Sequence, residues 1–103
     1  MGFNELITLA EREWDLDSGF LGKLRQGQFD RQAYGRFRQM LEKVRTETRD
    51  ADQLPRRLVS LIWYVPQFMY WQVQRVKGSI SLEEYEKAVN EMSSAVEEIL
   101  GVP

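Results

Sequence analysis

Apolar residues recur at intervals of three and four along most of this chain, and this spacing constrains the fold more than any other feature. The clearest case is segment 81–101, whose recurring apolar positions are Leu82, Tyr85, Val89, Met92, Val96 and Ile99. Ser81 and Glu84 have the spacing of a capping box, and Gly101 follows as a stop signal. This period places one apolar stripe along a helix. No segment alternates apolar and polar residues as a strand would, so the sequence predicts an all-α protein.

Helix start and stop signals divide the chain into five predicted helices, which cover about residues 4–14, 19–26, 31–49, 55–77 and 81–100. Asp30 is a suitable N-cap, and Phe29 and Tyr34 have the spacing of a hydrophobic staple. Gly27 is suited to end the second helix. Inside the fourth helix, Pro66 cannot donate a hydrogen bond to the carbonyl of residue 62, which predicts a kink or a break near residues 64 and 65.

All predicted connections are short, and the chain has 103 residues without a low-complexity linker. A chain of this length usually forms one compact core, and short connections favour antiparallel neighbours. We therefore expect a single domain over residues 1–103. It is predicted to be an antiparallel bundle of four to five helices with a Pro-kinked central helix.

The absence of cysteine and histidine removes many kinds of chemistry. The chain lacks the residues for a Ser-His-Asp or Cys-His nucleophile, a CxxC redox pair or a standard zinc site. Acidic residues remain, but the glutamates of the last helix project away from its apolar stripe. Glu47, Asp50 and Asp52 lack the glycine and the ligand order of a calcium loop. We expect no catalytic residue, no metal and no cofactor.

Residues 58–74 contain no charged side chain. This stretch is shorter than the roughly 20 apolar residues that a membrane-spanning helix needs, and it contains several polar residues. It is therefore interpreted as a buried central helix and not as a membrane segment. The N-terminus lacks the basic and apolar regions of a secretory signal, so we expect a cytoplasmic protein.

The aromatic residues of the central helix lie outside its aliphatic stripe when the helix is drawn without a kink. Tyr64 and Trp71 share one flank with Arg57 and Arg75, and these four residues are our predicted partner-binding patch, because aromatic and arginine side chains dominate the energetics of protein interfaces. The other flank carries Trp63, Tyr70, Arg56, Gln67 and Gln74. The alternative is that neighbouring helices cover both flanks.

The net charge of −2 conceals strong segregation along the chain. Residues 18–46 and 53–77 are basic, with net charges of +5 and +4, whereas residues 78–103 carry −5. In the last helix, Glu84, Glu91 and Glu98 recur every seven residues and form a predicted acidic docking face for a basic partner. The alternative is that these glutamates are solvated or pair with basic helices of the bundle. Nucleic acid is a disfavoured partner, because no helix-turn-helix is evident and the acidic helices would repel a polyanion.

These features predict a non-catalytic module that binds another protein, such as a basic toxin or a nucleic-acid-handling protein. In overall character the chain resembles small helical inhibitors of the bacterial immunity or antitoxin type, which occlude a partner, although no motif identifies a family. Two alternatives remain open. One is a self-associating, dimeric structural or adaptor protein, and the other is a bundle that binds a small ligand around Pro66.

Overall fold

Six helices and no strand make up residues 2–103, the part of the chain that the computed structural model describes. They are α1 (Phe3–Arg12), α2 (Phe20–Arg25), α3 (Arg31–Thr48), α4 (Arg56–Ile62), α5 (Val65–Trp71) and α6 (Leu82–Leu100). The predicted all-α class is confirmed. The helices pack into one body with a radius of gyration of 13.4 Å.

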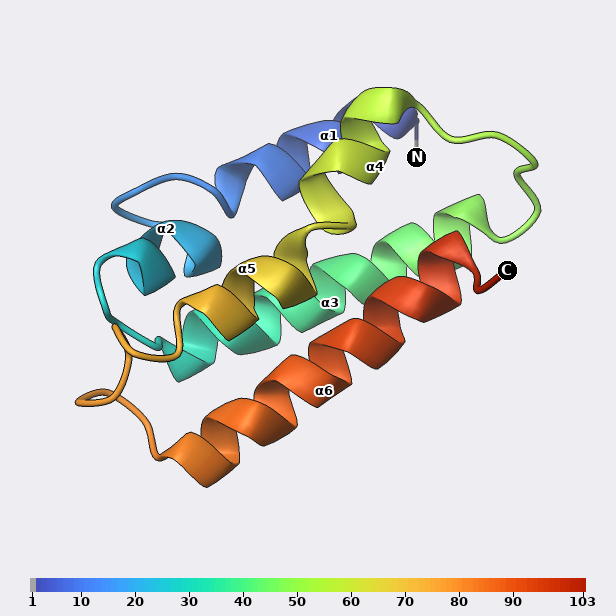
Figure 1. Ribbon diagram of the computed structural model, residues 1–103. Helices are drawn as coiled ribbons and strands as arrows, with labels where there is room; N and C mark the ends of the chain where they lie inside the picture. Colours follow the sequence, from blue (N-terminus) through green and yellow to red (C-terminus); the bar gives the residue numbers. More distant parts are fainter. Residues whose placement is uncertain (1) are drawn as a thin grey trace.

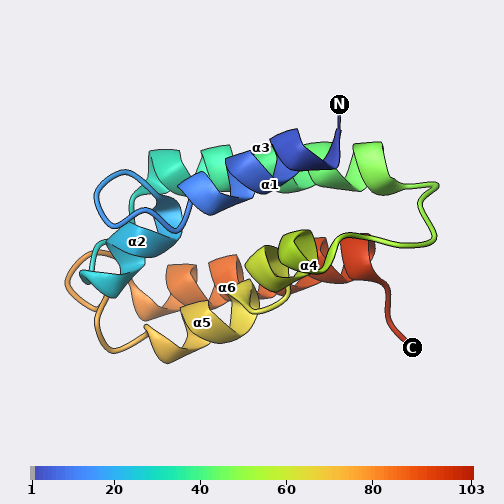
Figure 2. The same cartoon turned by 90° about the horizontal axis from the view of Figure 1, so that it is seen from above.

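The helices form two layers around a shared apolar core (Figures 1 and 2). One layer contains α1 and α3, the other contains α4, α5 and α6, and the short α2 lies at one end. Each helix turns its apolar stripe toward the space between the layers, which is filled by fully buried side chains such as Phe20, Phe37, Ile62, Met69 and Met92. Burial of these stripes is the main favourable contribution to folding.

Two neighbouring pairs of helices run parallel, which differs from the predicted antiparallel bundle. Between α3 and α6, contacts join residues 53 positions apart along the whole interface: Arg31–Glu84, Arg38–Glu91 and Arg45–Glu98. Between α1 and α4, Glu11 contacts Arg57, and Trp14 in the turn after α1 contacts Leu61, again in parallel order. The parallel order arises because these helices are not consecutive: the chain returns through α4 and α5 before α6 lies beside α3 (Figure 1).

The predicted helix signals are confirmed where they depend on local geometry. The Asp30 carboxylate accepts a hydrogen bond from the Ala33 N–H at 3.0 Å, and the Ser81 hydroxyl accepts one from the Glu84 N–H at 3.2 Å. Gly27 and Gly101 have φ values of 83° and 85°, in the left-handed region that favours glycine at a helix end.

The fourth predicted helix is not continuous. It forms two short helices, α4 and α5, separated by residues 63 and 64, and residues 72–79 form turns although the prediction extended the helix to residue 77. Pro66 has no N–H for the Ile62 carbonyl, and the Leu61 carbonyl accepts a hydrogen bond from the Trp14 indole Nε1 at 3.2 Å. The break expected near residues 64 and 65 is therefore confirmed, whereas the alternative, a single helix kinked at Pro66, is not what the structure has.

The uncharged run 58–74 supplies the buried sides of α4 and α5, where Leu58, Ile62, Val65 and Met69 are fully buried. The expectation of a buried central segment is confirmed for these four side chains, although the segment forms two helices. Within residues 2–103, no helix combines the length and apolarity needed to cross a bilayer.

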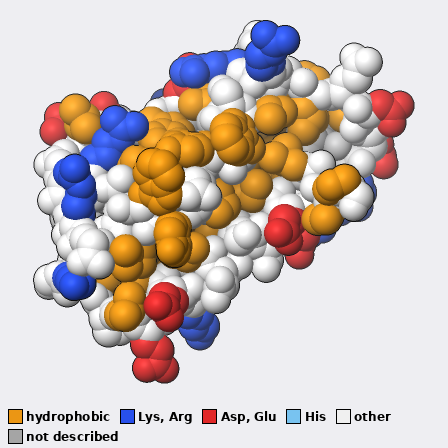
Figure 3. Space-filling model, viewed as in Figure 1, with side chains coloured by type: hydrophobic (Ala, Val, Ile, Leu, Met, Phe, Trp, Pro, Cys, Tyr) orange, Lys and Arg blue, Asp and Glu red, His pale blue; other side chains and the backbone are white. Residues whose placement is uncertain are grey.

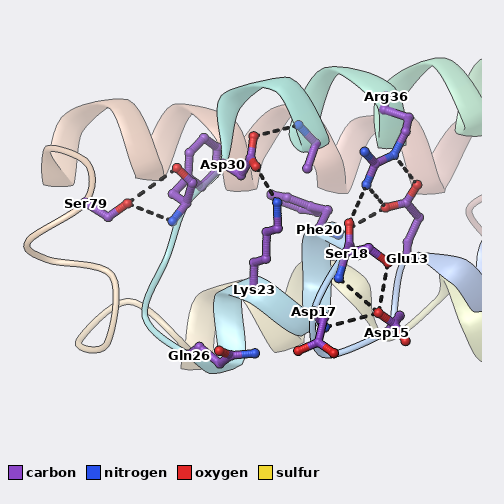
Figure 4. A network of polar contacts seen from close by, with 12 residues as sticks. Glu13, Asp15, Asp17, Ser18, Phe20, Lys23, Gln26, Asp30, Arg36 and Ser79 are labelled. Atoms are coloured by element: carbon purple, nitrogen blue, oxygen red, sulfur yellow. Dashed lines mark hydrogen bonds and ion pairs between the residues drawn. The ribbon is translucent and has the colours of Figure 1, made fainter.

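A polar network holds the turn between α1 and α2 (Figure 4). The Glu13 carboxylate accepts a hydrogen bond from the Phe20 N–H at 3.0 Å and forms an ion pair with Arg36 at 2.8 Å. Gly22 lies against this turn so closely that an added Cβ would be 1.8 Å from the Asp15 carbonyl oxygen. Close packing therefore explains why a residue without a side chain is needed at position 22. The hydrogen bond to Phe20 and the ion pair with Arg36 hold α2 beside α3.

Candidate functional site

Large apolar side chains are exposed on the face of the molecule that carries α4, α5 and α6 (Figure 3). The exposed fractions are 56% for Trp63, 66% for Tyr70, 65% for Trp71 and 56% for Leu82. Single exposed apolar residues are common, but a group of aromatic side chains on one face is typical of a binding surface. This face is therefore the candidate functional site.

The centre of this face is a groove of about 600 Å³ between α5 and the first half of α6. We call it the aromatic groove, and its lining residues are Tyr70, Trp71, Val73, Gln74, Leu82, Tyr85, Glu86, Val89 and Asn90. The C-terminal end of α5 and the turn after it form one wall, and the N-terminal half of α6 forms the other.

A buried tyrosine joins the two walls. Tyr85 is 1% exposed, and its hydroxyl donates a hydrogen bond to the Met69 carbonyl in α5. Burial raises the pKa of the Tyr85 phenol well above its ordinary value, so the hydroxyl keeps its proton and remains a donor. The aromatic groove therefore has a fixed floor and does not need a partner to assemble it.

Two consecutive aromatic residues at the C-terminal end of α5 line the groove. Its buried residues are Val65, Phe68 and Met69, which share one side of a seven-residue helix. Tyr70 and Trp71 both follow on the side away from the core. The sequence analysis placed them on opposite flanks of a continuous helix, whereas in the structure both line the aromatic groove at the end of α5.

The structure separates the four residues of the predicted patch. Trp71 lines the aromatic groove, but Tyr64 is half-buried, with its ring centroid 6.4 Å from that of Phe68. Arg57 forms an ion pair with Glu11 at 2.7 Å. Arg75 donates a hydrogen bond to the backbone carbonyl of residue 25 at 3.1 Å. Neither arginine lines the groove, so these side chains do not form one arginine and aromatic patch.

The three glutamates of the predicted acidic face point to α3 and form ion pairs there. The N–O distances are 3.0 Å for Arg31–Glu84, 3.7 Å for Arg38–Glu91 and 3.8 Å for Arg45–Glu98. Glu91 also accepts a hydrogen bond from the Tyr34 hydroxyl at 3.0 Å. We call these pairs the α3–α6 ladder. The heptad spacing of the glutamates therefore matches the heptad spacing of arginines on a neighbouring helix, which was the alternative to a docking face.

Sequence reasoning missed several residues of the site, notably Tyr70, Leu82, Glu86 and Asn90. Leu82 belongs to the apolar stripe predicted for the core, yet it is more than half exposed because it begins α6, where the helix extends beyond α5. Glu86 is one of three α6 glutamates, together with Glu83 and Glu97, for which the structure of residues 2–103 has no ion pair. The sequence feature that could have pointed to Glu86 as a site residue is its position one turn after Leu82, on the same side of the helix.

No three acidic side chains within residues 2–103 are grouped in a way that would hold a metal ion. Comparisons with protein-family models, curated proteins and solved structures give no match to this chain. The functional argument therefore depends on the geometry of the aromatic groove.

Proposed function

We propose that this protein is a non-catalytic binding module that docks a partner protein in the aromatic groove. The observation that carries the proposal is the exposure of Tyr70 and Trp71, each about two thirds exposed beside a groove whose floor is already built. Aromatic anchors around a pre-formed apolar groove are the common energetic centres of protein interfaces. A fixed groove also limits the ordering cost of association.

Binding at this face would cover a surface of the partner. If that surface contains the partner's own functional site, the module acts as an inhibitor by occlusion, as immunity and antitoxin proteins do. This is the most concrete form of the proposal, and Trp71 remains the residue expected to contribute most to it. Glu84, Glu91 and Glu98 are assigned to the α3–α6 ladder and not to docking.

Site-specific photo-crosslinking in the cells that carry the protein tests this function. A photoreactive phenylalanine in place of Trp71 is expected to give a discrete product with one partner, whereas the same group in place of Gln39, exposed on α3, is not. With the purified partner, Trp71→Ala is expected to lower affinity at least about tenfold and Gln39→Ala to leave it unchanged.

Equal crosslinking from both positions would contradict the proposal. Sedimentation of the protein alone at several concentrations provides the second check. We expect a monomer. A dimer that Trp71→Ala dissociates would show that the groove serves self-association, which would replace the proposed function by the structural or adaptor alternative.

A further inference from the structure

We infer that the partner presents an amphipathic α-helix to the aromatic groove, with lysine or arginine residues beside its apolar stripe. This inference depends on the proposed function and names the chemistry of the partner. Three observations carry it: the length of the groove, the absence of an open sheet edge, and the distribution of charge on α6.

The groove has the length of a short helical contact. Its α6 wall runs from Leu82 to Asn90, which corresponds to about 12 Å at the rise of an α-helix. About two turns of a partner helix lie along such a wall. Apolar side chains at positions i, i+4 and i+7 of that helix would then reach Leu82, Trp71 and Val89, in the helix-in-groove mode of recognition.

An extended peptide has no edge on which to pair. Residues 2–103 contain no strand, and both walls of the groove are helical or turn segments. Backbone groups inside a helix are already hydrogen-bonded, so a partner must be recognised through side-chain packing. A helix suits this surface because its own backbone groups are also satisfied.

The charges on α6 divide into two sets. Glu84, Glu91 and Glu98 form the α3–α6 ladder. On the groove side, Glu86 lines the groove and the adjacent Glu83 is exposed, and neither forms an ion pair within residues 2–103.

No lysine or arginine is among the residues that line the groove. Glu86 is the one charged side chain among these residues, so a partner helix meets a negative charge beside an apolar surface. Lysine or arginine flanking its apolar stripe provides the complement, whereas an acidic helix would be repelled.

Selection from a display library tests the inference. The library consists of helical peptides of about 16 residues, randomised along one face, and the target is the intact protein, with the Trp71→Arg variant used for counter-selection. We expect the enriched peptides to have apolar residues at i, i+4 and i+7 and lysine or arginine beside them. Their binding is expected to weaken as salt concentration rises.

Two matched variants locate the charge effect. Glu86→Lys is expected to lower the affinity for the enriched peptides at least about tenfold. Glu84→Lys, the same change on the opposite side of α6, is expected to leave that affinity within about twofold of its value for the unchanged protein. Circular dichroism and thermal unfolding of both variants confirm that the fold is kept. Equal loss in both variants would overturn the assignment of charge to the groove side.

The possible failures separate the two proposals. Enrichment of acidic or non-helical peptides that depend on Trp71 would overturn this inference and leave the proposed function in place. If no enriched peptide depends on Trp71 while crosslinking at Trp71 still identifies a partner, the helical partner is excluded and the docking function stands. Failure of both experiments would reject both proposals.

Discussion

At the scale of single residues, the buried carboxylate of Glu13 joins three elements of the fold. Its side chain is 5% exposed, and it accepts hydrogen bonds from the Phe20 N–H and from the half-exposed guanidinium of Arg36. The carboxylate therefore caps the start of α2 and ties α1 to α3. A buried carboxylate is stable only with such partners, and its removal leaves the Phe20 N–H without an acceptor.

We expect Glu13→Ala to lower the free energy of unfolding by about 2–4 kcal/mol, because it removes the cap of α2 and a largely buried ion pair. The matched control is Glu11→Ala, on the same helix. The Glu11–Arg57 pair is about half exposed on both sides, so its loss is expected to cost no more than about 1 kcal/mol. Chemical denaturation measures both values. If the two variants lose the same unfolding free energy, the burial of Glu13 does not make its contacts more stabilising than those of the exposed Glu11.

At the scale of elements, the break between α4 and α5 has two causes that act on adjacent carbonyl groups. Pro66 leaves the Ile62 carbonyl without its helical donor, and the Trp14 indole takes the Leu61 carbonyl. The Trp14 ring also packs edge-on against Phe68, with centroids 5.0 Å apart. The break is therefore held by a contact with the turn after α1 as well as by the proline.

Pro66→Ala alone is expected to leave the helix content unchanged, because Trp14 still occupies the Leu61 carbonyl. Trp14→Phe is expected to cost about 1–2 kcal/mol through the lost hydrogen bond, since a phenylalanine ring keeps most of the packing. Only the double variant is expected to gain helix across residues 62–65. Far-UV circular dichroism and denaturation check these values, and a gain in the Pro66→Ala protein equal to that of the double variant would assign the break to proline alone.

At the scale of the whole molecule, the segregated charges of the sequence are brought together. The basic segment 18–46 supplies α3, the acidic segment 78–103 supplies α6, and the α3–α6 ladder joins them in parallel. The ladder covers one side of α6 and leaves the groove side open. The apolar side of α6 faces the core, and the ladder pairs one flank of that side with α3.

Sodium chloride is expected to destabilise the protein modestly, because the ladder pairs are partly exposed and therefore screened. Raising the salt from about 0.02 M to about 0.5 M should lower the free energy of unfolding by about 1–2 kcal/mol for the three pairs together. The triple variant Glu84→Gln, Glu91→Gln and Glu98→Gln should lose most of this dependence. Urea denaturation at each salt concentration measures it, and an unchanged slope in the triple variant would show that the ladder is not its source.

The sequence predicted part of the candidate site. It identified Trp71 as an exposed aromatic residue and the last helix as acidic, because exposure and charge follow from the helical period. It did not predict that Tyr70, Leu82 and Glu86 lie around one groove with Trp71. That groove depends on where α5 ends and on which side of α6 packs against it, and neither property follows from the periodicity of one helix.

The sequence by itself determined the all-α class, most helix boundaries and the caps at Asp30 and Ser81, because these depend on contacts between residues three or four positions apart. The tertiary structure alone decided the parallel order of α3 and α6, the break held by Trp14 and the pairing of the heptad glutamates. These features join residues 47 to 53 positions apart, such as Trp14 with Leu61 and Arg31 with Glu84. Local periodicity determines which side of a helix is apolar, whereas the choice of neighbour depends on how all the apolar sides and charges are satisfied together.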